Sequence, residues 1–433
     1  MVVSNLNELS LKEVSQLIQS GTVQPRELVS DCIARIELCE EELNAFTTFD
    51  PGHIYDQLTE VERQGNKSAL FGVPVGIKDI METAGMRTTM GSKIYRDYVP
   101  QRDAVCVSML KTASALVAGK TETTEFAFFS PGRTRNPHAL DHTPGGSSMG
   151  SAAAVSKMMI PLALGTQTAG SVIRPAAYCG VTGYKASHGS FSLAGVCGFA
   201  QSLDTLGFFV RKVEDLTTVR HTLSGAPAEI LPLSGRIRVA LVKTPHWEMA
   251  DASQQQLIED VCRHLQGHQI EISEIEVGPS DGALTQAQIT IMGYEGCRSL
   301  SAEYAKFPHL LSDQIKVLIE QGQHTTHAAY LEAIKLGNIW QKKMRSVFKD
   351  YDVLITPSAP GEAPRGLDST GNPIFNRVWT LLKVPCIHLP VASGLNGLPI
   401  GVQLIGAFDQ DDYLIRAAHH IQEILAEFEF VPN

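Results

Sequence analysis

Two serines in a glycine-rich stretch, Ser147 and Ser171, have the residue type and setting for nucleophilic chemistry. The stretch covers residues 144–185 and reads PGGSSMGSAAAVSKMMIPLALGTQTAGSVIRPAAYCGVTGYK. Glycine lets a backbone approach another atom closely, and a serine hydroxyl can donate, accept or attack. Two such clusters, at 145–151 and 169–171, flank an apolar run at 158–164. We interpret the segment as a backbone built to surround a reacting group.

Ser171 comes directly before a predicted helix. The sequence VIRPAAYC after it favours a helix with Pro175 in the first turn. A serine at a helix N-terminus lies beside unpaired backbone N–H groups, and Thr168, Ala169 and Gly170 can bring further N–H groups close. Such donors stabilise the oxyanion that forms when a carbonyl is attacked. The pattern therefore indicates acyl chemistry at Ser171.

A serine nucleophile needs a base, and a lysine is the candidate here. No histidine occurs between residues 144 and 187, whereas lysine acting on serine is an accepted variant of the catalytic triad. Lys78 ends a predicted strand, FGVPVGIKDI, at residues 71–80. Two interpretations stay open: a solvated lysine at a strand end, or a lysine in a dry site whose lowered pKa lets it act as a base.

Several long motifs, in order along the chain, resemble the amidase signature family. They are GVPVGIKD, GGSSMGSAAAV, LGTQTAGSVIRPAAYCGVTGYK and SLDTLGFFVRKVED, followed by YDVLITPSAP and VPCIHLPVASGLNGLPIGVQLIG. The resemblance covers roughly residues 8–428. It implies a single α/β/α domain around a large mixed sheet.

The resemblance also implies a role for each matching residue. Ser171 would be the nucleophile, and Ser147, after a cis peptide bond from Gly146, would relay a proton. Lys78 would be the neutral base that draws this proton through Ser147. The backbone of Thr168, Ala169, Gly170 and Ser171 would form the oxyanion hole. The implied reaction is hydrolysis of a small-molecule amide, carbamate or urea-like bond through an acyl-enzyme, with no cofactor and no metal.

Three departures from the family pattern bear on the substrate. Many members have Asp-Thr-Gly-Gly-Ser where this chain has Gln167 to Ser171, and SVIRP replaces the commoner spacing. Glu122 stands where many members have asparagine. The first two changes, with a chain on the short side, argue against the glutaminase subunit of a tRNA-dependent amidotransferase. That subunit, and a catalytically silent binding subunit, remain the alternatives.

Other residues permit competing interpretations. Residues 146–150 fit the nucleophile elbow G-x-S-x-G with Ser148 as nucleophile, but a polar loop precedes them instead of a strand. His138 and His142 have the spacing of zinc ligands on a helix, yet two prolines bracket them. Arg174 either anchors the start of its helix or contacts substrate. Trp379 either belongs to the core or lines a pocket.

Composition and charge exclude several classes of function. The formal net charge of −10 argues against a nucleic-acid partner. No apolar run is long enough to span a membrane, and the N-terminus lacks the pattern of a secretory signal. The eight scattered cysteines, with no C-x-x-C pair, predict reduced thiols in a cytoplasmic protein. The frequency of dimers among oligomers is the sole reason to expect a homodimer.

The order of predicted elements indicates an α/β fold. A strand at 237–242, a helix at 252–265 and a strand at 270–277 form a β-α-β unit. Residues 284–349 favour helices, and residues 225–235 mark a softer edge. We expect one domain over residues 1–433, with a central mixed, mostly parallel sheet covered by helices on both faces.

Overall fold

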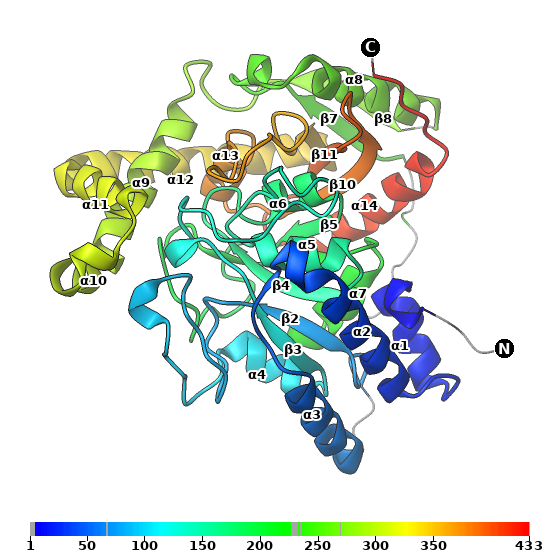
Figure 1. Cartoon of the computed structure of the whole chain (residues 1–433). Coiled ribbons are helices and arrows are strands. Elements are labelled where there is room, and N and C mark those ends of the chain that lie inside the picture. The colour runs from blue at the N-terminus through cyan, green and yellow to red at the C-terminus, as the bar shows by residue number, and fades with distance from the viewer. Residues whose placement is uncertain (1–4, 66–67, 227–232, 234–235, 269, 433) are drawn as a thin grey trace.

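One twisted sheet runs through the protein (Figure 1). Its strand order is β1-β3-β2-β4-β6-β5-β10-β11-β9-β7-β8. The structure, a computed structural model, describes residues 5–65, 68–226, 233, 236–268 and 270–432. The strands are β1 (Phe46–Phe49), β2 (Pro74–Lys78), β3 (Leu116–Thr121), β4 (Leu162–Gln167), β5 (Thr182–Lys185), β6 (Thr205–Val210), β7 (Arg238–Val242), β8 (Glu271–Ile275), β9 (Val353–Pro357), β10 (Cys386–Ser393) and β11 (Pro399–Ile405).

The sheet is mixed, as predicted, but the expectation that it is mostly parallel is wrong. Four pairings of the described strands are parallel, those of β2 with β3 and β4 and those of β7 with β8 and β9. The other six are antiparallel. The sequence indicates β-α-β units, which give parallel pairs. Strands β10 and β11, however, are joined only by residues 394–398, and so short a connection forces antiparallel pairing.

Helices cover both faces of this sheet. On one side α4, α7, α14 and α8 contact one another in succession, and α5 and α6 pack together against the central strands. The helices are α1 (Leu11–Gln19), α2 (Pro25–Leu43), α3 (Pro51–Gln64), α4 (Val105–Thr112), α5 (Met149–Ser156), α6 (Ile173–Cys179), α7 (Asp215–Ser224), α8 (Ala252–Gly267), α9 (Ala283–Ser299), α10 (Ser301–Lys306), α11 (Asp313–His324), α12 (His327–Asp350), α13 (Arg377–Leu381) and α14 (Asp411–Leu425).

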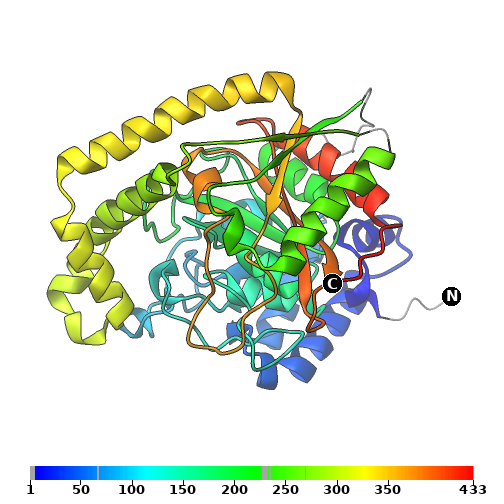
Figure 2. The ribbon, with the colours of Figure 1, turned by 90° about the horizontal axis from the view of Figure 1, so that it is seen from above.

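The segment predicted to be helical at 284–349 forms α9 to α12, which pack on one another beside the sheet (Figures 1 and 2). Helix α9 also contacts α13, which follows a long loop after β9. Most of the predicted softer edge at 225–235 lies outside the described residues. The helical group therefore stands next to the central strands and can contribute side chains to their ends.

The strands at the centre of the sheet are buried along their whole length. Every residue of β2, β3, β4, β5 and β6 is buried. Strands covered on both faces are expected to be apolar along their length, so the polar residues within them need a reason. Lys78, at the end of β2, is one of these residues.

Candidate active site

The ends of two neighbouring parallel strands bring the predicted residues together. β2 ends at Lys78, and β4 ends at Gln167 and leads into residues 168–171. The two strands pair in parallel, with Ile77 opposite Leu164. In open α/β sheets the carboxyl ends of parallel strands are where ligands bind. Lys78 and the loop that carries Ser171 therefore lie at the same edge of the sheet.

Lys78 is fully buried and contacts two hydroxyl groups. Its Nζ donates to Ser147 Oγ at 2.7 Å and to Thr166 Oγ1 at 2.9 Å. Desolvation lowers the pKa of Lys78 from 10.5 to about 7, although the nearby Asp204 carboxylate raises it. A substantial fraction of this amine is therefore neutral at neutral pH, with a lone pair available to Ser147.

Ser147 lies just before α5, and the preceding peptide bond from Gly146 is cis, as the resemblance implied. Its neighbour Ser148 is placed differently. Ser148 is fully buried, and its Oγ lies 3.3 Å from both the backbone nitrogen and the carbonyl oxygen of Thr166. The Ser148 hydroxyl thus ties α5 to β4 and does not line the pocket that contains Ser147. This position disfavours the nucleophile elbow.

The turn that carries Ser171 is held by Gln167. The Gln167 side-chain oxygen accepts the N–H groups of Val172 and Ile173, at 3.0 and 3.1 Å, at the start of α6. Its amide nitrogen donates to Thr380 Oγ1 at 3.0 Å. A Cβ at Gly170 would lie 2.4 Å from an Asn376 side-chain oxygen, so the turn requires glycine there. The departure at position 167 therefore has a structural role.

The backbone around Ser171 has free donors. Within the described residues, the N–H groups of Ala169, Gly170 and Ser171 donate no backbone hydrogen bond, because the helical pattern begins only after them. The Thr168 hydroxyl donates to Asp204 at 2.5 Å, and Asp204 also accepts the N–H groups of two residues. Burial raises the pKa of Asp204 to about 6. The turn is thus anchored at both ends, with its N–H groups left available.

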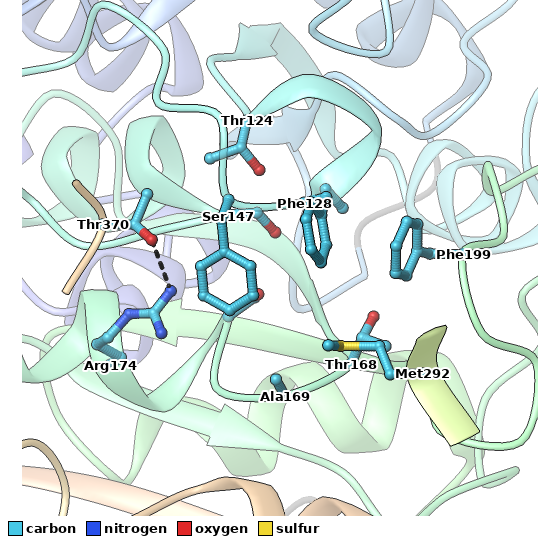
Figure 3. A pocket seen from close by; sticks show the side chains of 12 residues that line it. Thr124, Phe128, Ser147, Thr168, Ala169, Arg174, Phe199, Met292 and Thr370 are labelled. Atoms are coloured by element: carbon cyan, nitrogen blue, oxygen red, sulfur yellow. Dashed lines mark hydrogen bonds between the residues drawn. The ribbon is translucent and has the colours of Figure 1, made fainter. Parts of the chain in front are cut away.

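Both serines, Ser147 and Ser171, line one small pocket (Figure 3). The pocket and its mouth together contain about 270 Å³ of empty space, part of which is open solvent. Its lining residues come from separate segments: Thr124, Ala127, Phe128, Phe129, Ser147, Thr168, Ala169, Ser171, Arg174, Phe199, Met292 and Thr370. Phe128 and Phe129 also line a more open hollow with Leu318 of α11, so they stand between the pocket and the surface.

Sequence reasoning missed most of the pocket wall. Met292 comes from α9 and Thr370 from the loop after β9, far from the serine motifs in the chain. Arg174 is expected either to anchor local structure or to contact substrate, and both interpretations have support. Its guanidinium donates to the Gly146 carbonyl oxygen, next to Ser147, and its side chain also lines the pocket. Trp379 is fully buried and is absent from the pocket lining, which fits its core interpretation.

The other candidate residues lie elsewhere. His138 Nε2 lies 3.0 Å from the Cys179 carbonyl oxygen, and His142 Nδ1 lies 2.8 Å from Asp141. Glu122 is buried and accepts the N–H of Arg133. In the described parts of the chain no three His, Cys, Asp or Glu side chains gather as metal ligands would, and no helix there has the length and apolarity to cross a membrane.

Comparisons with known proteins show the family to which the chain belongs. A family model described as Amidase matches residues 27–415. A glutamyl-tRNA(Gln) amidotransferase subunit of Natranaerobius thermophilus is 30% identical, over 99% of this chain and 98% of that protein. Because that alignment spans nearly the whole relative, chain length no longer argues against this alternative.

Two solved structures share the fold at 25% identity. One, described as a vestigial protein complex that reveals the origins of an s-triazine catabolic enzyme, superposes with a TM-score of 0.88 over 96% of this chain and 98% of that one. Another, described as an amidase, superposes with a TM-score of 0.87 over 96% and 99%. With the family match over most of its length, the chain belongs to the amidase signature family of hydrolases that act on carbon–nitrogen bonds.

Proposed function

We propose that the protein hydrolyses a small-molecule amide, or a related carbamate or urea-like bond, through an acyl-enzyme on Ser171. The observation that carries the proposal is the contact between a fully buried lysine, Lys78, and the Ser147 hydroxyl beside the pocket that Ser171 lines. A dry lysine with a pKa of about 7 is matched to proton transfer at neutral pH. The reaction would need no cofactor.

The proposed reaction has two halves. In the first, Ser171 Oγ attacks the carbonyl carbon while its proton moves to Ser147 and the Ser147 proton moves to neutral Lys78. The N–H groups of residues 168–171 stabilise the oxyanion. When the C–N bond breaks, the proton returns along the same path to the leaving amine. In the second half a water molecule attacks the ester in the same way, which releases the acid and restores Ser171.

A phosphonate that reacts with activated serines tests the nucleophile directly. We expect one adduct on the native protein, located on Ser171 by peptide mass spectrometry, because this serine combines free N–H donors with a place in the pocket lining. Ser171→Ala protein and heat-denatured protein are the controls and should remain unlabelled. An adduct on Ser148 would instead support the nucleophile elbow and overturn the assignment.

A second candidate function is the glutaminase subunit of an amidotransferase, which the names of the curated relatives favour. Gln167, where many members have aspartate, weighs against it. If the subunit interpretation holds, the isolated chain should release little ammonia from glutamine and should gain activity only with partner subunits. We expect instead that the chain alone hydrolyses small amides, measured by ammonia release. Inactivity on all amides until partners are added would favour the second candidate.

A further inference from the structure

We propose that Gln288 of α9 and Thr380 of α13 are positioning residues for the reaction, because each holds one peptide unit of the turn before Ser171 so that its N–H faces the pocket. The proposal rests on the proposed acyl-enzyme mechanism and deepens it. It starts from the three peptide units of residues 168–171. Each of their carbonyl oxygens accepts a hydrogen bond, whereas none of their N–H groups donates one to the described backbone.

The direction of each N–H group in this turn is set by the carbonyl oxygen of the same peptide unit. A planar trans peptide points its carbonyl oxygen and its N–H in opposite directions. Among the described residues the cis bond between Gly146 and Ser147 is the only one, so the units of the turn are trans. A donor that holds a carbonyl oxygen on one side of the turn therefore holds the N–H of the next residue on the other side.

The Thr168 carbonyl oxygen is held by a glutamine that can face it in one way only. Gln288 is fully buried, and its side-chain nitrogen donates to this oxygen at 2.9 Å. Its side-chain oxygen accepts from Arg377 Nη1. Because a guanidinium only donates, the Gln288 oxygen must face Arg377 and the nitrogen must face the turn. Burial lowers the pKa of Arg377 to about 10, so it stays charged at neutral pH and polarises this amide.

The Ala169 carbonyl oxygen is held by a hydroxyl group from α13. Thr380 Oγ1 lies 3.0 Å from this oxygen and 3.3 Å from the Asn376 carbonyl oxygen, so the Ala169 oxygen is the nearer acceptor. The same hydroxyl accepts from the Gln167 side chain, which leaves its one proton for donation. The carbonyl oxygen of Gly170 is held by the backbone of α6. All three peptide units thus direct their N–H groups away from these donors.

These contacts give the helical group beside the sheet a part in the chemistry. Met292, one turn after Gln288 on α9, lines the pocket with Thr168 and Ala169 (Figure 3). Donors stabilise an oxyanion best when they are already aimed at it, and one such donor contributes about 10²- to 10³-fold to kcat. Gln288 and Thr380 act on kcat without contact with the substrate, because neither lines the pocket.

The first test removes the Gln288 donor and keeps the length of the side chain. In Gln288→Met, kcat per active site should fall by about tenfold, since the donor on the turn is loosened and not deleted. KM should change by less than about threefold, because the substrate itself loses no contact. Active sites are counted by labelling with the phosphonate to completion, so misfolded molecules do not enter the rate.

The matched control is Gln254→Met. It removes another buried glutamine, whose side chain donates to the Gly401 carbonyl oxygen of β11 at 3.0 Å. This variant loses the same kind of contact, and its kcat and KM should equal those of the natural protein. An undiminished kcat in Gln288→Met, or an equal loss in both variants, would overturn the role of Gln288.

Two substitutions at Thr380 test the second peptide unit. Valine replaces the hydroxyl by a methyl group of similar size, so kcat of Thr380→Val should fall by about tenfold with little change in KM. Serine keeps the hydroxyl, and Thr380→Ser should retain most of the natural kcat. A serine variant as slow as the valine variant would assign the loss to packing and refute the role of Thr380.

A measurement that needs no turnover separates this inference from the proposed chemistry. The sequence has three Thr–Ala pairs, so protein with ¹³C-carbonyl threonine and ¹⁵N-alanine gives three carbonyl–amide correlation signals, from Thr83–Ala84, Thr112–Ala113 and Thr168–Ala169. The last signal is identified by its loss in Ala169→Gly, and it alone should shift in Gln288→Met. That shift, in a protein that hydrolyses no amide, would refute the proposed hydrolysis and leave the hold on the turn standing. Hydrolysis without the shift would refute the hold alone.

Discussion

Alanine in place of Ser171 is expected to lower kcat by about 10⁴-fold or more, to the level that a preformed site alone supports. The substitution removes the atom that forms the acyl bond but leaves the turn, because Gln167 holds the start of α6 through backbone groups. Binding of substrate should therefore survive. The measurement is ammonia release under saturating amide, with protein purified free of the natural enzyme.

The companion variants distinguish the three serines of the motif. Ser147→Ala should cost nearly as much as Ser171→Ala, and the double variant little more than either, because groups that act as a unit are not additive. Ser148→Ala should retain most of the activity, since among the described residues its hydroxyl hydrogen-bonds only to the Thr166 backbone. If Ser171→Ala hydrolysed every tested amide as fast as the natural protein, the acyl-enzyme proposal would be refuted.

How much of this site could be read from the sequence depends on distance along the chain. Ser147 and Ser171 lie in one segment, and their motifs are long and specific. The pairing of Lys78 with Ser147 follows once β2 and β4 lie side by side in parallel. The pocket wall could not be predicted in this way. Phe129, Met292 and Thr370 belong to loops and a helix with no pattern of their own, and only tertiary packing brings them together.

Local chemistry was predicted less well than element order. Asp103 has the residue type of an N-cap, and the sequence favours it as the start of the helix that follows. In the structure Ala104 is the N-cap of α4, because the Asp103 carboxylate instead accepts the N–H of Ala84 and pairs with Lys111. The Asp103 carboxylate thus binds a backbone group distant in the sequence instead of capping the helix that follows it. The single-domain assignment and the cytoplasmic location stay predictions.

Partners distant in the sequence also decide the environment of Lys78, which the sequence leaves open. Alternation along β2 places it on a face with small residues but cannot say what covers that face. In the structure α5 packs against β2 and β4 and brings Ser147 over the strand end. Lys78 is therefore buried, as the second of the two interpretations requires. Its catalytic role is what a substitution must test.

Methionine in place of Lys78 is expected to lower kcat/KM by about 10³-fold, within the range that a general base contributes. For the natural protein, kcat/KM should rise with pH and level off above about pH 7, because the amine acts only when neutral and its pKa is about 7. This acidic limb should disappear in Lys78→Met. The matched control is Lys111→Met, which replaces a lysine of α4 that pairs with Asp103. This variant should keep both the kcat/KM and the pH dependence of the natural protein.

The stability of Lys78→Met shows whether lost activity reflects the missing base or a damaged fold. The folded pKa of about 7 lies below the ordinary lysine value of 10.5, so between these pH values the unfolded chain binds a proton that the folded chain lacks. This lysine therefore destabilises the folded protein at pH 7 and below, and its penalty fades as pH rises towards 10.5. Urea unfolding at pH 7 should show Lys78→Met to be at least as stable as the natural protein. An equally stable variant with undiminished kcat/KM would exclude Lys78 as the base, whatever its distance from Ser147.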